Sequence, residues 1–240
     1  MKKSGFSLAE VLITLAIVGF IAAVTLPSLQ MNVEKQKVGP SLMKAVNTLE
    51  VANSVALQVA EAATLNEIAL EDENNYLGDV LKDYTKLVEV EYDATTGNPM
   101  TGDSFYATKD GIVLTASKLT SGGAADVKTS GTYYLVQADI NGSKGPNLAG
   151  KDIFKLYVDT KGIVIPYGSR LGEGYTKDWK LWTEGCKSIK KGEQKAAPTG
   201  AETCAGSIVD NGGRILYFYE GISASSSGSS STGGGEGSGS

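Results

Sequence analysis

An apolar run over residues 6–26 constrains this chain more than any other feature of its sequence. Roughly 20 helical residues cross a hydrocarbon core of about 30 Å, so the run is long enough to span a bilayer. It nevertheless contains one carboxylate, Glu10. A charged side chain within a spanning helix costs about 2.5–3.5 kcal/mol on insertion scales, so Glu10 is by default a candidate functional group with a partner.

Two ordinary interpretations of this N-terminus each leave something unexplained. A secretory signal fits the basic start, Lys2 and Lys3, but its candidate cleavage site near residues 22–23 has an isoleucine where a small residue is preferred. A single-pass anchor, with the two lysines in the cytoplasm and the rest of the chain outside, fits the length of the run. It accounts for Glu10 only if the carboxylate reaches the lipid headgroups from its place near one end.

A third interpretation rests on six residues: Lys2, Lys3, Gly5, Phe6, Leu8 and Glu10. Together they resemble the type III signal of type IV prepilins and pseudopilins, in which a membrane peptidase cuts after the glycine and methylates the new N-terminus. The resemblance implies cleavage between Gly5 and Phe6. Residues 1–5 are then a leader peptide, and residues 6–27 stay in the mature protein as a transmembrane helix that also forms the core of a filament.

The spacing between Phe6 and Glu10 indicates a partner for the Glu10 carboxylate, namely the Phe6 amine of a neighbouring subunit. Four residues rise about 6 Å along a helix. If a neighbouring subunit is shifted by about one helical turn, the amine of its Phe6 can therefore lie level with Glu10 in a low-dielectric core. Removing one member of a buried ion pair costs about 3–5 kcal/mol. We therefore predict that Glu10 and Phe6 form an assembly contact.

Two further positions extend the resemblance. Gly19 lies within the apolar stretch, and Pro27 ends it where type IV pilins commonly carry a proline. Proline removes one helical hydrogen bond, and the helix of the family can loosen between such residues inside a filament. Glycine is common in membrane helices in any case. Gly19 and Pro27 are predicted to mark a helix break.

Composition restricts the other functions that the chain could have. Its 240 residues are 41% hydrophobic, which is enough for one modest domain with appendages. The net charge of −5 disfavours nucleic-acid binding, because an acidic surface repels phosphate backbones. There is no histidine, which excludes histidine-dependent triads and most zinc sites. No other cluster combines a base, a nucleophile and an orienting group, so no enzyme is expected.

The remaining sequence predicts a pilin-like α+β fold, in which a long N-terminal helix packs on a small antiparallel sheet. Apolar residues recur near a spacing of 3.6 from residue 28 to about residue 71, with a kink or break at Gly39–Pro40. A shorter helix is expected over residues 76–87. Strands are predicted at residues 104–117, as a hairpin around an Asp-Gly turn, and at 132–140, 153–158, 163–166 and 215–219. The strands up to residue 166 form an antiparallel meander of about four strands, and residues 215–219 form a last strand. Residues 28–222 form the globular domain. The Gly/Ser-rich residues 223–240 are a flexible tail.

The two cysteines, Cys186 and Cys204, lie close together in sequence behind a membrane-targeting segment. That context favours one disulfide formed outside the cytoplasm, with two free core thiols as the alternative. Lysines are frequent between them, which makes this loop either a contact surface or a solvated charged loop. Trp179 and Trp182, three residues apart just before it, are expected in the core.

Residues 139–152 carry two competing patterns. Gly145 to Lys151 satisfies the first part of a phosphate loop, but Asp152 stands where Ser or Thr should hold magnesium, and a strand follows where a helix is required. The oxygen-bearing side chains of this loop could instead bind calcium; they are Asp139, Asn141, Ser143, Asn147 and Asp152. Some pseudopilins carry a calcium-stabilised loop in their sheet region. A rigid turn without a cofactor is the alternative, because Asx/Gly clusters are usually turns.

The resemblance implies a structural subunit of a type IV pilus-like filament or a type II secretion pseudopilus. Its partners would be the prepilin peptidase and methyltransferase, other copies or other pilins in the filament, and an assembly platform in the inner membrane. The chain would be a single-pass inner-membrane protein with its C-terminal domain outside the cytoplasm, and then part of a periplasmic or surface filament. The loop at residues 139–152 favours the secretion type. The alternative is a minor or tip pilin, an adhesive or binding module displayed by the same anchor.

Overall fold

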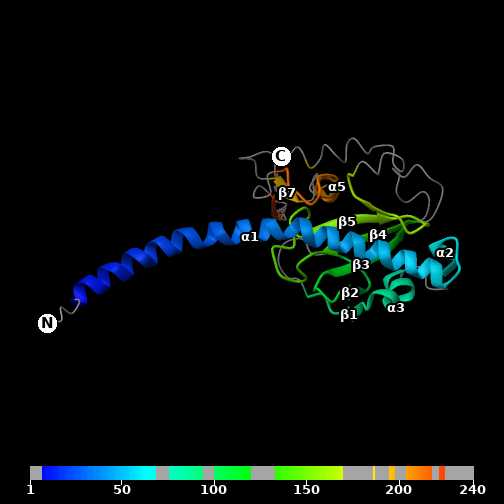
Figure 1. Cartoon of the computed structure of the whole chain (residues 1–240), viewed down its shortest axis with the longest axis horizontal. Helices are drawn as coiled ribbons and strands as arrows, with labels where there is room; N and C mark the ends of the chain where they lie inside the picture. The colour runs from blue at the N-terminus through cyan, green and yellow to red at the C-terminus, as the bar shows by residue number, and fades with distance from the viewer. Residues whose placement is uncertain are drawn as a thin grey trace, which may run out of the picture.

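The structure is a computed structural model, and it describes residues 7–68, 76–93, 100–119, 133–169, 186, 195–197, 204–217 and 222–224. One long helix, α1 (Leu8–Val59), dominates it. The first half of α1 extends away from the rest of the molecule, and its second half lies along the globular domain (Figure 1). The domain therefore sits at one end of a helix whose other end carries only the N-terminus.

The second half of α1 buries one stripe of side chains against the domain. The buried residues are Val38, Leu42, Ala45, Val46, Leu49, Ala52, Asn53 and Ala56. Their spacing of three and four residues is that of one helical face, as predicted. The helix ends at Val59 and not near residue 71, because Glu61 takes a positive φ of 49° that reverses the chain. The backbone N–H of Leu65 then donates to the carbonyl of Thr160 at 2.7 Å, and its side chain enters the core.

The expected break at Gly39–Pro40 is absent, since α1 continues through both residues. The glycine has a different role there. A Cβ atom at position 39 would lie 1.8 Å from the carbonyl oxygen of Gly213. Gly39 therefore allows a C-terminal segment to approach the helix backbone, and the sequence signal that suggested a kink marks a close contact instead.

A short helical stretch follows α1, after the four-residue α2 (Leu65–Ile68). It consists of a π-helical segment, η1 (Tyr76–Leu81), continued by α3 (Lys82–Thr85), within the range where the sequence predicted a helix. The ring of Tyr76 is fully buried and stacks on Tyr134 with centroids 4.4 Å apart. This stretch therefore closes the far end of the core between α1 and the sheet.

Six antiparallel strands form the main sheet in sequential order. They are β1 (Val88–Val90), β2 (Phe105–Ala107), β3 (Val113–Leu119), β4 (Tyr133–Asp139), β5 (Ile153–Val158) and β6 (Val164–Pro166). Five of them match predicted strands, including the hairpin whose turn places Gly111 at a φ of 82°. The sequence missed β1, which has only three residues. The α+β class with a long helix on an antiparallel meander is confirmed.

The C-terminal region differs more from its prediction. A helix, α5 (Cys204–Asp210), packs beside β6, and β7 (Lys195–Ala197) pairs in parallel with β8 (Ile222–Ala224). Residues 215–217 are not a strand, and residues 218–219 lie outside the described residues. Tyr217 is buried and its hydroxyl donates to the carbonyl of Gly150. The last strand therefore lies later than predicted, and β8 includes two residues of the expected tail.

The sheet carries apolar side chains on both faces. Leu114 belongs to the large core under α1, whereas the preceding residue, Val113, belongs to a smaller cluster with Met100 and Ile153. Successive residues of a strand point to opposite faces. Tyr92 and Met100, which follow β1 in the chain, thus pack on the second face, and the Tyr92 hydroxyl donates to Asp139 at the end of β4.

Candidate functional site

The first half of α1 is an exposed apolar helix. Residues Leu8–Leu26 form the one helix among the described residues that is long and apolar enough to cross a membrane, and none of that stretch is buried in the domain. Leu8 is 78% exposed and Phe20 is 72% exposed. A helix that is apolar all round is stable only when lipid or other helices cover it. This half of α1 is therefore a transmembrane helix and a surface for contacts outside the chain.

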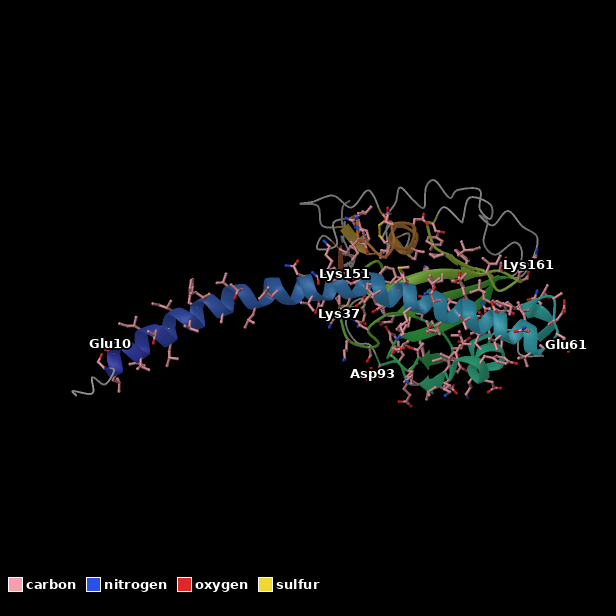
Figure 2. The ribbon with its side chains drawn as sticks, viewed as in Figure 1. Glu10, Lys37, Glu61, Asp93, Lys151 and Lys161 are labelled. Atoms are coloured by element: carbon pink, nitrogen blue, oxygen red, sulfur yellow. A yellow bond between two sulfur atoms is a disulfide. The ribbon has the colours of Figure 1, made fainter. Side chains whose placement is uncertain are left out.

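Glu10 lies at the free end of this helix, far from the domain (Figure 2). Its carboxylate accepts a hydrogen bond from the backbone N–H of Ser7 at 2.8 Å, and its own N–H donates to the Ser7 hydroxyl oxygen at 3.3 Å. These two bonds form a capping box that satisfies donors at the helix start. This capping role was not predicted, although Ser-x-x-Glu before an apolar run is its sequence signal.

The assembly contact predicted for Glu10 involves residues that the structure leaves out. Gly5 and Phe6 lie outside the described residues. The Oε2 atom of Glu10 accepts the bond from the Ser7 N–H. The pairing of Glu10 with the Phe6 amine of a neighbour stays a prediction.

The predicted helix break is not seen in the single chain. α1 runs without interruption through the positions of Gly19 and Pro27. A Cβ atom at Gly19 would meet no atom within 4 Å. Packing within this chain thus does not require a glycine there, and a loosening of the helix inside a filament stays a prediction.

Loop 139–152 brings the two predicted acidic ligands together in buried positions. The Asp139 carboxylate accepts from the Tyr92 hydroxyl at 2.6 Å and from the Asn141 backbone N–H at 3.1 Å. The Asp152 carboxylate accepts from the backbone N–H groups of Asn147 at 2.8 Å and Leu148 at 2.6 Å. The side-chain amide of Asn141 also donates to Asp152, at 3.4 Å. The loop is thus folded around its own two carboxylates.

Burial shifts the pKa of both carboxyl groups upward. Burial raises the pKa of Asp139 to about 7, against the lowering effect of the Tyr92 hydrogen bond. Burial also raises the pKa of Asp152, opposed by the N–H groups of Leu148 and Asn147. The negative charge of Asp152 is a further cause of the shift at Asp139. The loop therefore holds two like charges that are poorly solvated.

These residues meet only part of what a calcium site needs. An all-oxygen ligand set suits calcium, and Asp139, Asn141, Asn147 and Asp152 lie around one loop. Ser143, however, is exposed, and the described residues contain no group of three or more His, Cys, Asp or Glu side chains that could hold a metal. The hydrogen bonds above account for both carboxylates without a cation. Calcium binding and a rigid turn without a cofactor therefore both stay open as interpretations of this loop.

The phosphate-loop pattern has no structural counterpart here. β5 begins at Ile153, directly after the loop, so no helix N-terminus follows Lys151. The loop instead turns back on Asp152, with a left-handed residue at Asn147. Beside it, a cavity of about 120 Å³ separates the loop from Glu34–Ser41 of α1. Lys37 and Lys151 both lie where α1 enters the domain (Figure 2).

The disulfide is confirmed. Cys186 and Cys204 are bonded and completely buried in the main core. The alternative of two free thiols is therefore wrong. Trp179 and Trp182 lie outside the described residues, so their placement in the core stays a prediction.

Comparison with known proteins bears on the N-terminus alone. Residues 1–26 match the family model described as the prokaryotic N-terminal methylation motif. No curated protein and no solved structure matches the chain. The motif, the apolar helix and the disulfide together support a protein of the type IV prepilin and pseudopilin type.

Proposed function

We propose that this chain is the precursor of a structural subunit of a helical filament, either a type IV pilus or a type II secretion pseudopilus. One observation carries the proposal: a methylation motif over residues 1–26 opens a helix whose first half is exposed and apolar and whose second half holds a folded domain. A prepilin peptidase would cut after Gly5 and methylate Phe6. The motif favours a structural role over an enzymatic one.

Assembly is proposed to use the exposed half of α1. Packing against the same half of neighbouring copies would cover its apolar side chains, which nothing in the domain covers. The Glu10 carboxylate would meet the Phe6 amine of a neighbour and so set the axial offset between copies. A contact that joins two different surfaces and does not close produces a helical polymer.

The location follows from the same helix. The chain would lie in the inner membrane as a single-pass protein, with Lys2 and Lys3 in the cytoplasm. The domain would then be outside the cytoplasm, where a disulfide such as Cys186–Cys204 can form. An inner-membrane platform would pass subunits from the bilayer into the filament. We favour the secretion type, because loop 139–152 joins two strands of the sheet, where pseudopilins can carry their ordered loop.

N-terminal mass spectrometry of membrane and sheared-surface fractions tests the proposal. The expected mature chain begins with methylated Phe6 in the membrane fraction. The same species in the sheared fraction indicates a surface pilus, whereas its restriction to cells indicates a pseudopilus. A mature chain that begins at Val24, without the apolar helix, would contradict the proposed function.

A further inference from the structure

The main sheet has one unpaired edge among the described residues. β1 pairs with β2 on one side, and no described strand pairs with its other side. A groove of about 480 Å³ lies over the edge strand β1, the start of its partner β2 and the segments next to them. The rings of Tyr92 and Phe105, stacked with centroids 4.9 Å apart, are among the residues that line it. We call it the edge groove.

Three carboxylates give this edge groove its charge. Glu89, Glu91 and Asp103 line it, and all three are exposed. Among the described residues, the structure shows an ion pair between Lys44 and Asp110, whose nitrogen and oxygen atoms are 2.7 Å apart. The three groove carboxylates are not part of it. The edge therefore selects a cationic occupant and repels an acidic one.

This acidic chain contains a segment of the opposite charge near its C-terminal end. Residues 186–197 include four lysines and one glutamate. The lysines are Lys187, Lys190, Lys191 and Lys195. The segment is tied to the domain at both ends, by the buried Cys186–Cys204 bond and by β7, which begins at Lys195. Residues 187–194 themselves lie outside the described residues.

The anchors of the basic segment and the edge groove lie on opposite sides of the domain. β1 is the first strand in the order of the sheet and β6 is the last. α5, which begins at Cys204, is fastened beside β6, because the Gly206 N–H donates to the carbonyl of Tyr167 at 2.8 Å. Figure 1 shows β1 at the lower margin of the domain and β7 and α5 at the upper margin.

We propose that the edge groove of one copy binds the basic segment, residues 187–195, of the neighbouring copy. Because the groove and the anchors of the basic segment lie on opposite sides of the domain, each subunit would present one to each neighbour, and the contact would repeat without closing. This lateral contact joins the domains, whereas Glu10 and Phe6 join the helices. The lateral contact rests on the proposed function as a filament subunit. It would help to determine which subunits can assemble with one another.

Charge reversal in the full-length chain, in the cells that assemble it, tests this contact. Glu89→Lys with Glu91→Lys is expected to lower the filament yield about tenfold, because like charges are placed against each other. Lys190→Glu with Lys191→Glu is expected to do the same. The four substitutions together should restore most of the yield. A zero-length carbodiimide crosslink between isotopically distinct copies should join the peptides that contain these residues.

Controls separate this contact from folding and from the proposed function itself. Glu50→Lys with Glu61→Lys changes the charge equally at exposed positions outside the groove, and should leave the yield unchanged. All variants should retain the Cys186–Cys204 disulfide and methylated Phe6. Normal filaments from either reversed pair, or no recovery on combining them, would overturn the lateral contact and leave the filament proposal intact. A wild-type chain that is processed but never polymerises would overturn both.

Discussion

The side-chain amide of Asn53, on the buried face of α1, donates a hydrogen bond to the backbone carbonyl of Gly162 at 2.9 Å. Gly162 lies in the turn between β5 and β6 and takes a φ of 82°. The other end of the same amide, its Oδ1 atom, accepts from the buried hydroxyl of Tyr76. One polar side chain thus ties α1 to the sheet and to η1.

Gly162→Ala should destabilise the domain because a methyl group has no room there. Its Cβ would lie 2.7 Å from the Cβ of Asn53, in a backbone conformation that itself costs a non-glycine residue about 1–2 kcal/mol. We expect a loss of more than about 2 kcal/mol, measured by thermal unfolding of the detergent-solubilised chain through near-ultraviolet circular dichroism. Gly111→Ala is the matched control, since Gly111 has the same φ of 82° with no atom within 4 Å. Equal losses in the two variants would show that the contact with Asn53 is unimportant.

Substitutions at Glu10 and Ser7 separate helix capping from subunit pairing. Glu10→Ala should leave membrane insertion and cleavage intact and impair assembly. Glu10→Gln keeps a side chain that can close the capping box but has no charge, so we expect it to impair assembly as strongly. Ser7→Ala removes the cap, at about 1 kcal/mol of helix stability, and keeps the charge. It should assemble nearly normally. Filament yield, with mass spectrometry of the processed N-terminus, is the measurement, and a normal yield from Glu10→Gln would contradict the pairing.

Gly39→Ala should lower the stability of the domain even though alanine favours a helix by about 1 kcal/mol. The added methyl would collide with the backbone of Gly213, so the segment after α5 must move. Limited proteolysis should then cut near residues 211–217 more rapidly. Gly19→Ala, in the exposed half of the same helix, should leave the unfolding of the domain unchanged. A Gly39→Ala domain with wild-type stability would contradict the close contact.

Reduction of the Cys186–Cys204 disulfide should destabilise the C-terminal part of the domain. A bond across 18 residues contributes about 3 kcal/mol through loop entropy. For a domain of this size we expect Tm to fall by about 6–12 °C in reductant. Cys186→Ser combined with Cys204→Ser should show the same decrease and no further response to reductant. A Tm independent of reductant in the wild-type chain would contradict this contribution.

Calcium titration decides between the two interpretations of loop 139–152. Because hydrogen bonds account for both buried carboxylates, we expect calcium to change Tm by less than about 1 °C, equivalent to a few tenths of a kcal/mol. Isothermal titration calorimetry should likewise show no saturable heat. A saturable rise in Tm that Asp152→Asn abolishes would establish a calcium site instead.

The local pattern of residues was sufficient for the elements that depend on local physics. An unbroken apolar run of this length must be covered by lipid or by other helices, and this is visible in the sequence itself. The apolar half of α1 was therefore predictable from residues 6–26. The period of 3.6 identified the face of α1 that packs on the domain. The β-branched and aromatic residues of β5 and the Asp-Gly turn before β3 placed those strands, because a strand or tight turn draws its preference from its own few residues.

Close approaches between distant segments were not predictable in this way. Gly39 and Gly213 are 174 positions apart, and only the folded chain shows that one glycine leaves room for the other. β1 is too short to carry a pattern, and its strand conformation depends on pairing with β2. The same holds for α5, whose glycine at position 206 lies against the backbone of Ser169.

The sequence alone therefore determined how the chain starts: a methylation motif, a spanning helix and one acid within it, all properties of consecutive residues. Tertiary structure decided which polar groups are satisfied. It brought the Tyr92 hydroxyl, 47 positions away, to the carboxylate of Asp139, and the side-chain amide of Asn53 to the carbonyl of Gly162. It also placed an acidic groove opposite the anchors of a basic segment (Figure 1). Such relationships arise when packing brings separate parts of the chain within a few ångströms, and no linear pattern encodes that distance.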